Sequence, residues 1–114
     1  MNKLFVYGSL KRGFHNAHYL HGALYLGDFV TPASYAMYDF GDYPGVCQSG
    51  SSAIAGEVYQ INPQHLDAID DLEWYPDFYQ RIVLATDYGD AWMYVVEPAL
   101  CQGQKKITGN WREI

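Results

Sequence analysis

The sequence is poor in cysteine and in basic residues, and it has no long apolar run. Its two cysteines, Cys47 and Cys101, occur in no CxxC or Cys/His pattern, so we expect neither a disulfide framework nor a zinc site. Lys and Arg total 7 against 13 Asp and Glu, for a formal net charge of -6. Because nucleic acids and anionic membranes bind basic surfaces, we expect neither as a partner. With no membrane span or signal peptide in the sequence, the expected location is the cytoplasm, where both thiols stay reduced.

Aromatic residues, by contrast, are abundant, at 17% of the sequence, with tyrosine the most frequent. Because tyrosine has an apolar body and a polar tip, this composition suits the lining of a polar cavity or a barrel interior. An ordinary strand-rich core is the commoner cause of such a composition. The length of 114 residues is enough for one hydrophobic core, so we expect a single domain over residues 1–114.

Turn and cap signals divide the chain into short elements. Asn62 followed by Pro63 is typical of a helix start, and Pro76 limits continuation, which predicts a helix over 63–74. Pro44 and Gly45 predict a turn over 42–45. Many short strands and one clear helix indicate an α+β fold, most simply a small closed or nearly closed mixed β-barrel with short peripheral helices. The predicted strands cover 4–7, 23–30, 34–40, 52–61, 79–86 and 91–96, with a brief helix at 16–21 and a tail, 105–114, that adds a strand or covers the barrel edge.

Glu73 is the first candidate for chemistry. In a helix, Leu66, Ile69 and Glu73 share one stripe, whereas Asp67 and Asp71 project toward solvent. A carboxylate on an apolar face is costly to desolvate, and this raises its pKa toward the range in which a general base works. The alternative is that Glu73 is a structural carboxylate paired with a residue such as Arg81.

The segment Val6 to Leu10 is the second candidate. It reads as a buried strand that ends in Gly8 and Ser9. Glycine lets the backbone approach a ligand closely, and successive N–H groups that leave a strand can bind a carboxylate or an oxyanion. A plain turn is the alternative reading of the same residues.

The segment after Glu73 is rich in aromatic residues, which can wall a pocket over the carboxyl group or simply cap the core. Glu57 is the second-choice acid, because strand alternation places it among mostly apolar residues, where it would support the pocket. The spacing of His15, His18 and His21 is a weak metal pattern, and the acidic run before Glu73 lacks calcium-loop spacing. We therefore expect no metal and no cofactor.

Four motifs in order resemble the gamma-glutamylcyclotransferase-like family, and most closely its short gamma-glutamylamine cyclotransferase type. They are VYGSL at 6–10, YPGV at 43–46, GEVY at 56–59 and LDxxxxLE at 66–73, the last followed by YxR at 79–81. Together they span most of the chain. One departure from the family pattern is Trp74, which stands where the family usually has a small residue, often glycine.

The resemblance implies a small mixed barrel with peripheral helices and a cofactor-free enzyme that releases 5-oxoproline from a small gamma-glutamyl substrate. A non-catalytic module that binds a small ligand in the same pocket is the alternative. The resemblance does not specify the oligomeric state. It implies that Glu73 is the acid/base and that the substrate-binding residues are Tyr7, Gly8, Ser9, Leu10 and Tyr79.

Overall fold

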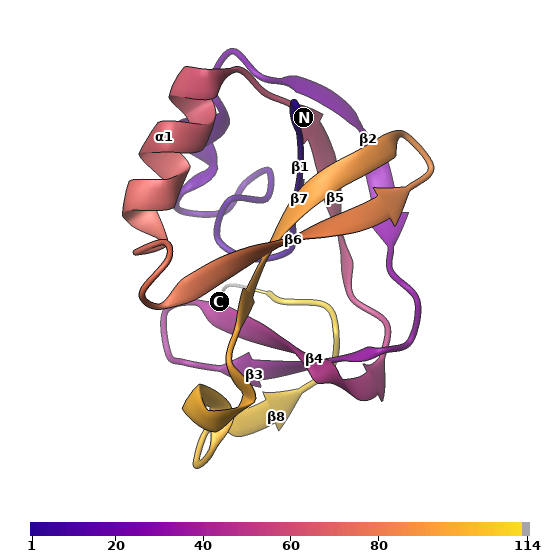
Figure 1. Ribbon diagram of the computed structural model, residues 1–114, viewed down its shortest axis with the longest axis vertical. Coiled ribbons are helices and arrows are strands. Elements are labelled where there is room, and N and C mark those ends of the chain that lie inside the picture. The colour runs from indigo at the N-terminus through magenta and orange to yellow at the C-terminus, as the bar shows by residue number, and fades with distance from the viewer. Residues whose placement is uncertain (113–114) are drawn as a thin grey trace.

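The computed structural model of the protein describes residues 1–112. Over these residues the chain forms strands, one α-helix and two short 3₁₀ helices, which confirms the predicted α+β class (Figure 1). The strands are β1 (Lys3–Val6), β2 (Leu24–Val30), β3 (Tyr35–Asp39), β4 (Pro44–Ser52), β5 (Ala55–Gln60), β6 (Tyr79–Thr86), β7 (Gly89–Val96) and β8 (Lys105–Ile107). The helices are η1 (Ala17–Leu20), α1 (Pro63–Leu72) and η2 (Pro98–Cys101).

The larger sheet has five strands in the order β2-β5-β1-β7-β6. Its central strand, β1, is antiparallel to β5 and parallel to β7. The apolar run Leu4, Phe5 and Val6 explains this position, because all three side chains are at most 2% exposed. A strand that is buried on both faces reads as a continuous apolar run rather than as an alternating one. The loop after Val6 therefore leaves from the middle of the core.

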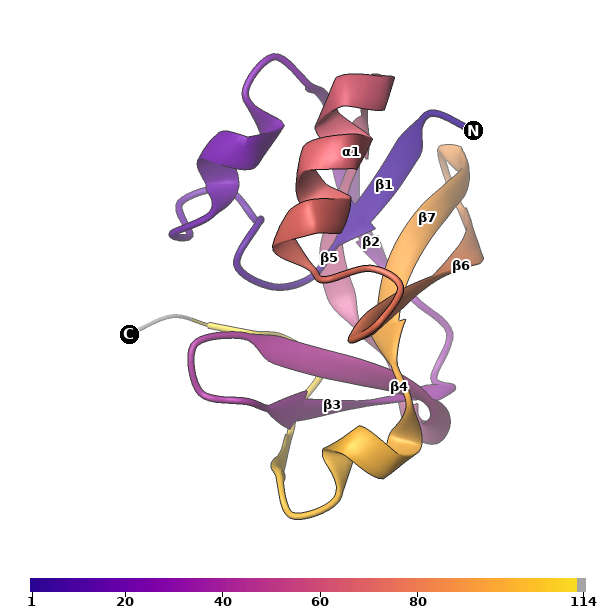
Figure 2. The same ribbon diagram turned by 60° about the vertical axis from the view of Figure 1, so that its left-hand side comes forward.

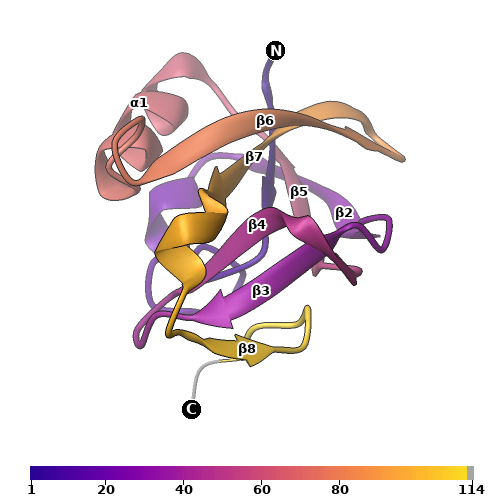
Figure 3. The ribbon, with the colours of Figure 1, turned by 60° about the horizontal axis from the view of Figure 1, so that its bottom comes forward.

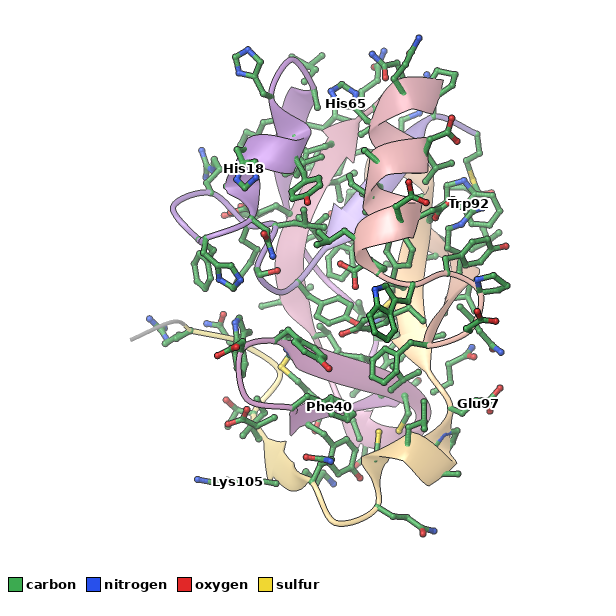
Figure 4. All side chains as sticks on the ribbon, turned by 90° about the vertical axis from the view of Figure 1, so that its left-hand side faces the viewer. His18, Phe40, His65, Trp92, Glu97 and Lys105 are labelled. Carbon is green, nitrogen blue, oxygen red and sulfur yellow. The ribbon has the colours of Figure 1, made fainter. Side chains whose placement is uncertain are left out.

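The helix α1 starts as the sequence predicts. The Asn62 side chain accepts a hydrogen bond from the His65 backbone N–H, 2.8 Å away, and His65 Nδ1 accepts in return from the Asn62 N–H. Ile69 is fully buried against the core. Figure 2 shows α1 lying across the sheet beside the segment that contains η1, and His65 Nε2 lies 2.8 Å from the His21 carbonyl oxygen. Figure 4 shows His65 near this end of α1 and His18 on the neighbouring segment.

The smaller sheet has the order β4-β3-β8 (Figure 3). Its strand β4 corrects two predictions, because Pro44 begins a strand rather than completing a turn over 42–45, and the strand predicted over 52–61 is limited to Ala55–Gln60. The turn lies earlier, where the Phe40 N–H donates to the Tyr43 carbonyl. Proline is tolerated at the first residue of β4 because β4 is an edge strand.

Three further expectations are revised. The described strands form two hydrogen-bonded sheets, so the predicted closed barrel is not seen over residues 1–112. The brief helix predicted at 16–21 is a single 3₁₀ turn, and α1 ends at Leu72 rather than at Trp74. The tail supplies the short strand β8, while the rest of that prediction, residues 113–114, lies outside the described part of the chain. No helix of the described residues is both long and apolar enough to span a membrane.

Candidate active site

A narrow pocket lies where the loop after β1 meets the end of α1 and the start of β6. It has a volume of about 30 Å³, and we call it the inner pocket. Every residue that the sequence analysis assigned to a substrate site lies on its wall, although these residues come from three separate parts of the chain. The inner pocket is lined by Phe5, Val6, Tyr7, Gly8, Ser9, Leu10, Tyr43, Pro44, Glu73, Tyr79 and Tyr94.

The loop from Tyr7 to Leu10 is held in a tight conformation. A Cβ atom on Gly8 would lie 2.8 Å from Cγ of Pro44, so glycine is required there by the close approach of β4. Asn16 holds Ser9 by two hydrogen bonds, since its side-chain Nδ2 donates to Ser9 Oγ and its backbone N–H donates to the Ser9 carbonyl, both at 2.9 Å. Leu10 is buried and anchors the far end of the loop.

The backbone N–H groups of this loop are available for a ligand. Within residues 1–112, the N–H groups of Gly8, Ser9 and Leu10 donate to no backbone or side-chain acceptor. By contrast, the Lys11 N–H closes the turn by donating to the Gly8 carbonyl at 3.1 Å. Consecutive N–H groups without protein partners are a requirement of the anion-binding concavity that the sequence predicts for this loop, and that binding role stays a prediction.

Glu73 stands at the C-cap of α1, one residue beyond the last helical position. Its backbone N–H donates to the Ile69 carbonyl at 2.9 Å. The next residue, Trp74, has φ 53 and donates to the Asp71 carbonyl, while the Tyr75 N–H donates to the Asp70 carbonyl. These two bonds and the left-handed residue make a Schellman motif, which ends the helix abruptly. The chain turn fixes the point from which the Glu73 side chain extends.

The carboxyl group of Glu73 is short of partners. Burial raises the pKa of Glu73 to about 7, with no opposing charge to lower it. Among the described residues no ion pair includes Glu73, and the expectation that Arg81 might be its partner is wrong. Arg81 Nε lies 3.1 Å from Asp70 Oδ1 instead, one helical turn before Glu73, in an ion pair without aligned hydrogen-bond geometry.

The ion pair of Asp70 and Arg81 belongs to a network that supports one wall of the pocket. The Arg81 guanidinium lies over the rings of Tyr75 and Trp92, at 4.2 and 4.6 Å from their centroids. The Tyr94 hydroxyl donates to Asp70 Oδ1 at 2.6 Å, and Tyr94 also lines the inner pocket. The sequence analysis did not single out Tyr94. Tyr94 lies in the apolar second half of β7, where consecutive residues are buried, and such a run does not distinguish a pocket wall from the core.

Two buried tyrosines on the wall act as neutral hydrogen-bond donors. The Tyr7 hydroxyl donates to the Tyr94 carbonyl at 2.8 Å, and the Tyr79 hydroxyl donates to the Pro44 carbonyl at 2.5 Å. Burial and the nearby Glu73 carboxylate raise the pKa of both phenols well above the usual range, with Tyr7 contributing further at Tyr79. They therefore shape the pocket and keep their protons at neutral pH. Tyr79 also connects the larger sheet to the first residue of β4.

A second, larger pocket opens beside the inner one. It has a volume of about 370 Å³, and we call it the outer pocket. Both pockets include Ser9, Tyr43, Glu73 and Tyr79, so the two pockets are neighbours with a shared wall. The outer pocket is lined in addition by His15, Asn16, Leu72, Trp74 and Phe78.

Other candidates from the sequence lie elsewhere or are unsuited to chemistry. Glu57 lines neither pocket; its carboxylate accepts from the Tyr59 hydroxyl at 2.9 Å and lies 3.6 Å from Arg12 Nε. Both cysteines are buried, and burial together with the neighbouring Cys47 raises the pKa of the Cys101 thiol to about 11. Within residues 1–112, no group of three His, Cys, Asp or Glu side chains is placed to hold a metal ion.

Comparisons with known proteins identify the family of the chain. The family model for gamma-glutamyl cyclotransferase, AIG2-like, matches residues 4–113. The Escherichia coli gamma-glutamylcyclotransferase family protein YtfP is 39% identical over 110 residues, which cover 96% of this chain and 95% of that one. The gamma-glutamylaminecyclotransferase of Rattus norvegicus is 34% identical over 97 residues, which cover 74% of this chain and 62% of the rat protein.

The fold agrees as well. The solution NMR structure of the Escherichia coli YtfP protein aligns with a TM-score of 0.76 at 38% identity, over 97% of this chain and 96% of that one. The match therefore extends over nearly the full length of both proteins, in sequence and in fold. The chain belongs to the gamma-glutamyl cyclotransferase, AIG2-like, family.

Proposed function

We propose that the protein releases 5-oxoproline and a free amine from a gamma-glutamyl amine or peptide, with Glu73 as the acid/base. The observation that carries this proposal is a single carboxyl group of raised pKa facing a loop with unused N–H groups. Among the described residues that line the inner pocket, Glu73 is the only carboxylic acid, and none is Lys, Arg, His or Cys. Family membership supports a cyclotransferase activity in general.

The reaction begins with a proton transfer to Glu73. The alpha-ammonium group of the substrate gives one proton to the carboxylate, and the resulting amine attacks the gamma-carbonyl carbon of the same glutamyl group. A C–N bond forms, and the carbonyl oxygen becomes an oxyanion in a tetrahedral intermediate. The pKa of about 7 suits Glu73 to this step, because a large share of the group is ionised at neutral pH and its basicity is still appreciable.

The second step returns the proton. Glu73, now protonated, donates this proton to the leaving nitrogen, and the original C–N bond breaks as the oxyanion becomes the lactam carbonyl. The ring nitrogen still carries the second proton of the attacking amine; it gives this proton to the regenerated Glu73 carboxylate, and Glu73 passes it to the departing amine, which leaves as an ammonium ion. The products are 5-oxoproline and the amine, and the enzyme regains its carboxylate. One acid/base group is enough for both steps, because the nucleophile and the electrophile are in the same molecule, and the pocket has only to hold them in a folded arrangement.

The loop from Gly8 to Leu10 supplies the hydrogen bonds that the substrate needs. Its N–H groups are without acceptors within residues 1–112, so a substrate carboxylate or the developing oxyanion can accept from them without displacing a protein bond. The neutral hydroxyls of Tyr7 and Tyr79 are engaged with backbone carbonyls, so their role in the proposal is to shape the pocket. No cofactor takes part in this scheme.

The proposed substrate class is a gamma-glutamyl amine, which is supported by the name of the rat relative. In keeping with this, we propose a single cytoplasmic domain over residues 1–114 that acts on a small molecule. The rival role is a module that binds the same ligand without turnover. The two roles differ in one respect that can be measured, because a binding module has no use for a base of raised pKa.

The test is release of 5-oxoproline, measured by mass spectrometry over a panel of gamma-glutamyl amines and dipeptides. Wild type should release it, and Glu73→Gln should be slower by about 10²- to 10⁴-fold, the usual contribution of a general acid/base. Thermal unfolding of both proteins with each compound gives the second measurement. A ligand-induced shift without turnover in wild type would favour the binding module, and normal turnover by Glu73→Gln would refute the mechanism.

A further inference from the structure

We propose that the outer pocket binds the leaving amine, and that Trp74 selects amines that are aromatic or apolar and carry no carboxylate. This inference rests on the proposed function and makes the substrate class narrower. It assigns a role to a residue that departs from the family pattern and that the reaction scheme itself does not use.

The two pockets divide the substrate at its reacting bond. The inner pocket, at about 30 Å³, is much the smaller of the two and lies against the loop from Tyr7 to Leu10, so it is assigned to the glutamyl end of the substrate. The outer pocket, at about 370 Å³, can take a substituent the size of an aromatic ring with its linker. Glu73 lies on both walls. If the gamma-carbonyl sits at Glu73, the leaving nitrogen therefore directs its substituent into the outer pocket.

The lining of the outer pocket favours an apolar amine. Leu72, Trp74 and Phe78 form an apolar side, and Tyr43 adds a ring that packs edge-on against Phe78 at 6.1 Å between centroids. Of the described residues on this wall, none is Lys or Arg, and the only carboxylic acid is Glu73. The polar side of the wall consists of Ser9, His15 and Asn16. A carboxylate on the leaving amine would lose its hydration beside the Glu73 carboxyl group with no Lys or Arg to pair with, whereas a ring would gain apolar contacts on the other side.

Neither the backbone nor the burial of Trp74 calls for a large side chain at this position. Trp74 is in the left-handed region at φ 53, at the helix-ending position where glycine is favoured because it has no Cβ. Its side chain is not held by the core either, since the residue is 73% exposed. A large aromatic side chain at such a position is explained by a surface that it provides, and that surface is the wall of the outer pocket.

The experiment compares three substrates that differ only in the leaving group. They are the gamma-glutamyl amides of methylamine and phenethylamine, and gamma-glutamyl-phenylalanine, which has the same ring as the phenethylamide plus a carboxylate. In wild type, kcat/KM for the phenethylamide should exceed the values for both other compounds by about 10-fold or more, the range expected when a pocket discriminates by apolar contacts.

Variants of Trp74 then test whether this residue causes the preference for the phenethylamide. Trp74→Gly should lower kcat/KM for the phenethylamide by about 10-fold, mainly through KM, and should lower the value for the methylamide by a much smaller factor, because a methyl group makes few contacts with the outer pocket. Trp74→Phe, which keeps an aromatic wall, should retain most of the preference. Since glycine suits the left-handed backbone, Trp74→Gly should fold with an unchanged or higher thermal midpoint, which separates a lost contact from a lost fold.

Each outcome decides the matter. A phenethylamide preference that Trp74→Gly removes and Trp74→Phe keeps supports the inference. Equal turnover of the three substrates by wild type, or an equal fall for phenethylamide and methylamide in Trp74→Gly, overturns it and leaves the proposed function standing. Failure of wild type to release 5-oxoproline from any of the three compounds overturns both the inference and the proposed function.

Discussion

Glu57 and Glu73 are both partly buried glutamates, and their surroundings are opposite in kind. The carboxylate of Glu57 accepts hydrogen bonds from the Arg12 N–H at 3.0 Å and from the Tyr59 hydroxyl at 2.9 Å, and it faces the Arg12 guanidinium. Glu73 has no ion pair among the described residues and lies on two pocket walls. The difference shows how a fold assigns roles to identical side chains. A carboxylate with partners is structural, and one that is buried without them remains available for proton transfer.

The largest expected effect comes from neutralising each glutamate in turn and measuring activity. Glu73→Gln should lose about 10²- to 10⁴-fold in 5-oxoproline release, whereas the matched control Glu57→Gln should stay within about threefold, because Glu57 touches neither pocket. Steady-state kinetics on one gamma-glutamyl amine would measure both. Comparable losses of activity in the two variants would show that the different surroundings of Glu57 and Glu73 do not decide which of them takes part in catalysis.

The second prediction concerns the ion pair between Arg81 and Asp70, which leaves Arg81 without a bond to Glu73. Asp70→Ala should lower the free energy of unfolding by about 2–3 kcal/mol, because it leaves the guanidinium of Arg81, a side chain 14% exposed, without its carboxylate. Urea denaturation at neutral pH gives the value. A loss below about 0.5 kcal/mol would show that Arg81 finds another partner. In that case the pH dependence of activity would show whether the new partner is Glu73. An ion pair between Arg81 and Glu73 would lower the pKa of Glu73, and the midpoint of the activity profile would then lie below pH 7.

The third prediction uses the pKa of Glu73 as a stability signal. Because the folded-state pKa is about 7 against an ordinary value of 4.5, ionising Glu73 penalises the folded state as pH rises from 4.5 through 7. Relative to wild type, Glu73→Gln should therefore be more stable by about 1–3 kcal/mol above pH 8, and by little at pH 4.5. Urea denaturation at the two pH values tests this. An advantage of the same size at both would contradict a raised pKa.

The smallest expected change in stability comes from removing Arg12, the ion-pair partner of Glu57. Arg12→Ala removes an ion-pair partner whose side chain is 59% exposed, so the free energy of unfolding should fall only slightly. The change should also diminish at high salt, which screens exposed charges. Denaturation at low and high ionic strength would measure both effects. A large fall in the free energy of unfolding would show that the contacts of Arg12 with Glu57 stabilise the fold more than the exposure of Arg12 suggests.

Much of the site follows from local sequence signals. Asn62 and Pro63 mark the start of α1, and from that start the periodicity places Glu73 at the core side of the helix end. The apolar run before Gly8 likewise predicts a buried strand and a loop that leaves it. These signals are reliable because each depends on neighbours within a few residues. What they leave open is whether the two segments meet, which the structure shows that they do.

The features that sequence reasoning missed depend on contacts between distant segments. The strand β4 is polar over its second half, and its pairing with β3 rather than its own apolar pattern makes it a strand. The partner of Arg81 was misassigned because Asp70 and Glu73 lie one turn apart on the same helix, and only the position of β6 decides between them. The closed or nearly closed barrel is not confirmed, because local patterns do not distinguish one closed sheet from the two hydrogen-bonded sheets that residues 1–112 form.

The turn after Glu73 has a consequence for how this family can diversify. It is closed by its own backbone bonds, since the Phe78 N–H donates to the Trp74 carbonyl at 2.8 Å and the Tyr79 N–H donates to the Glu73 carbonyl at 3.4 Å. Its residues belong to neither the helix nor the strand. Substitutions here can remodel the outer pocket while the carboxyl group and the core keep their places. If the outer pocket binds the leaving amine as proposed, a change at the exposed residue Trp74 would alter the substrate range while the backbone bonds of the turn remain.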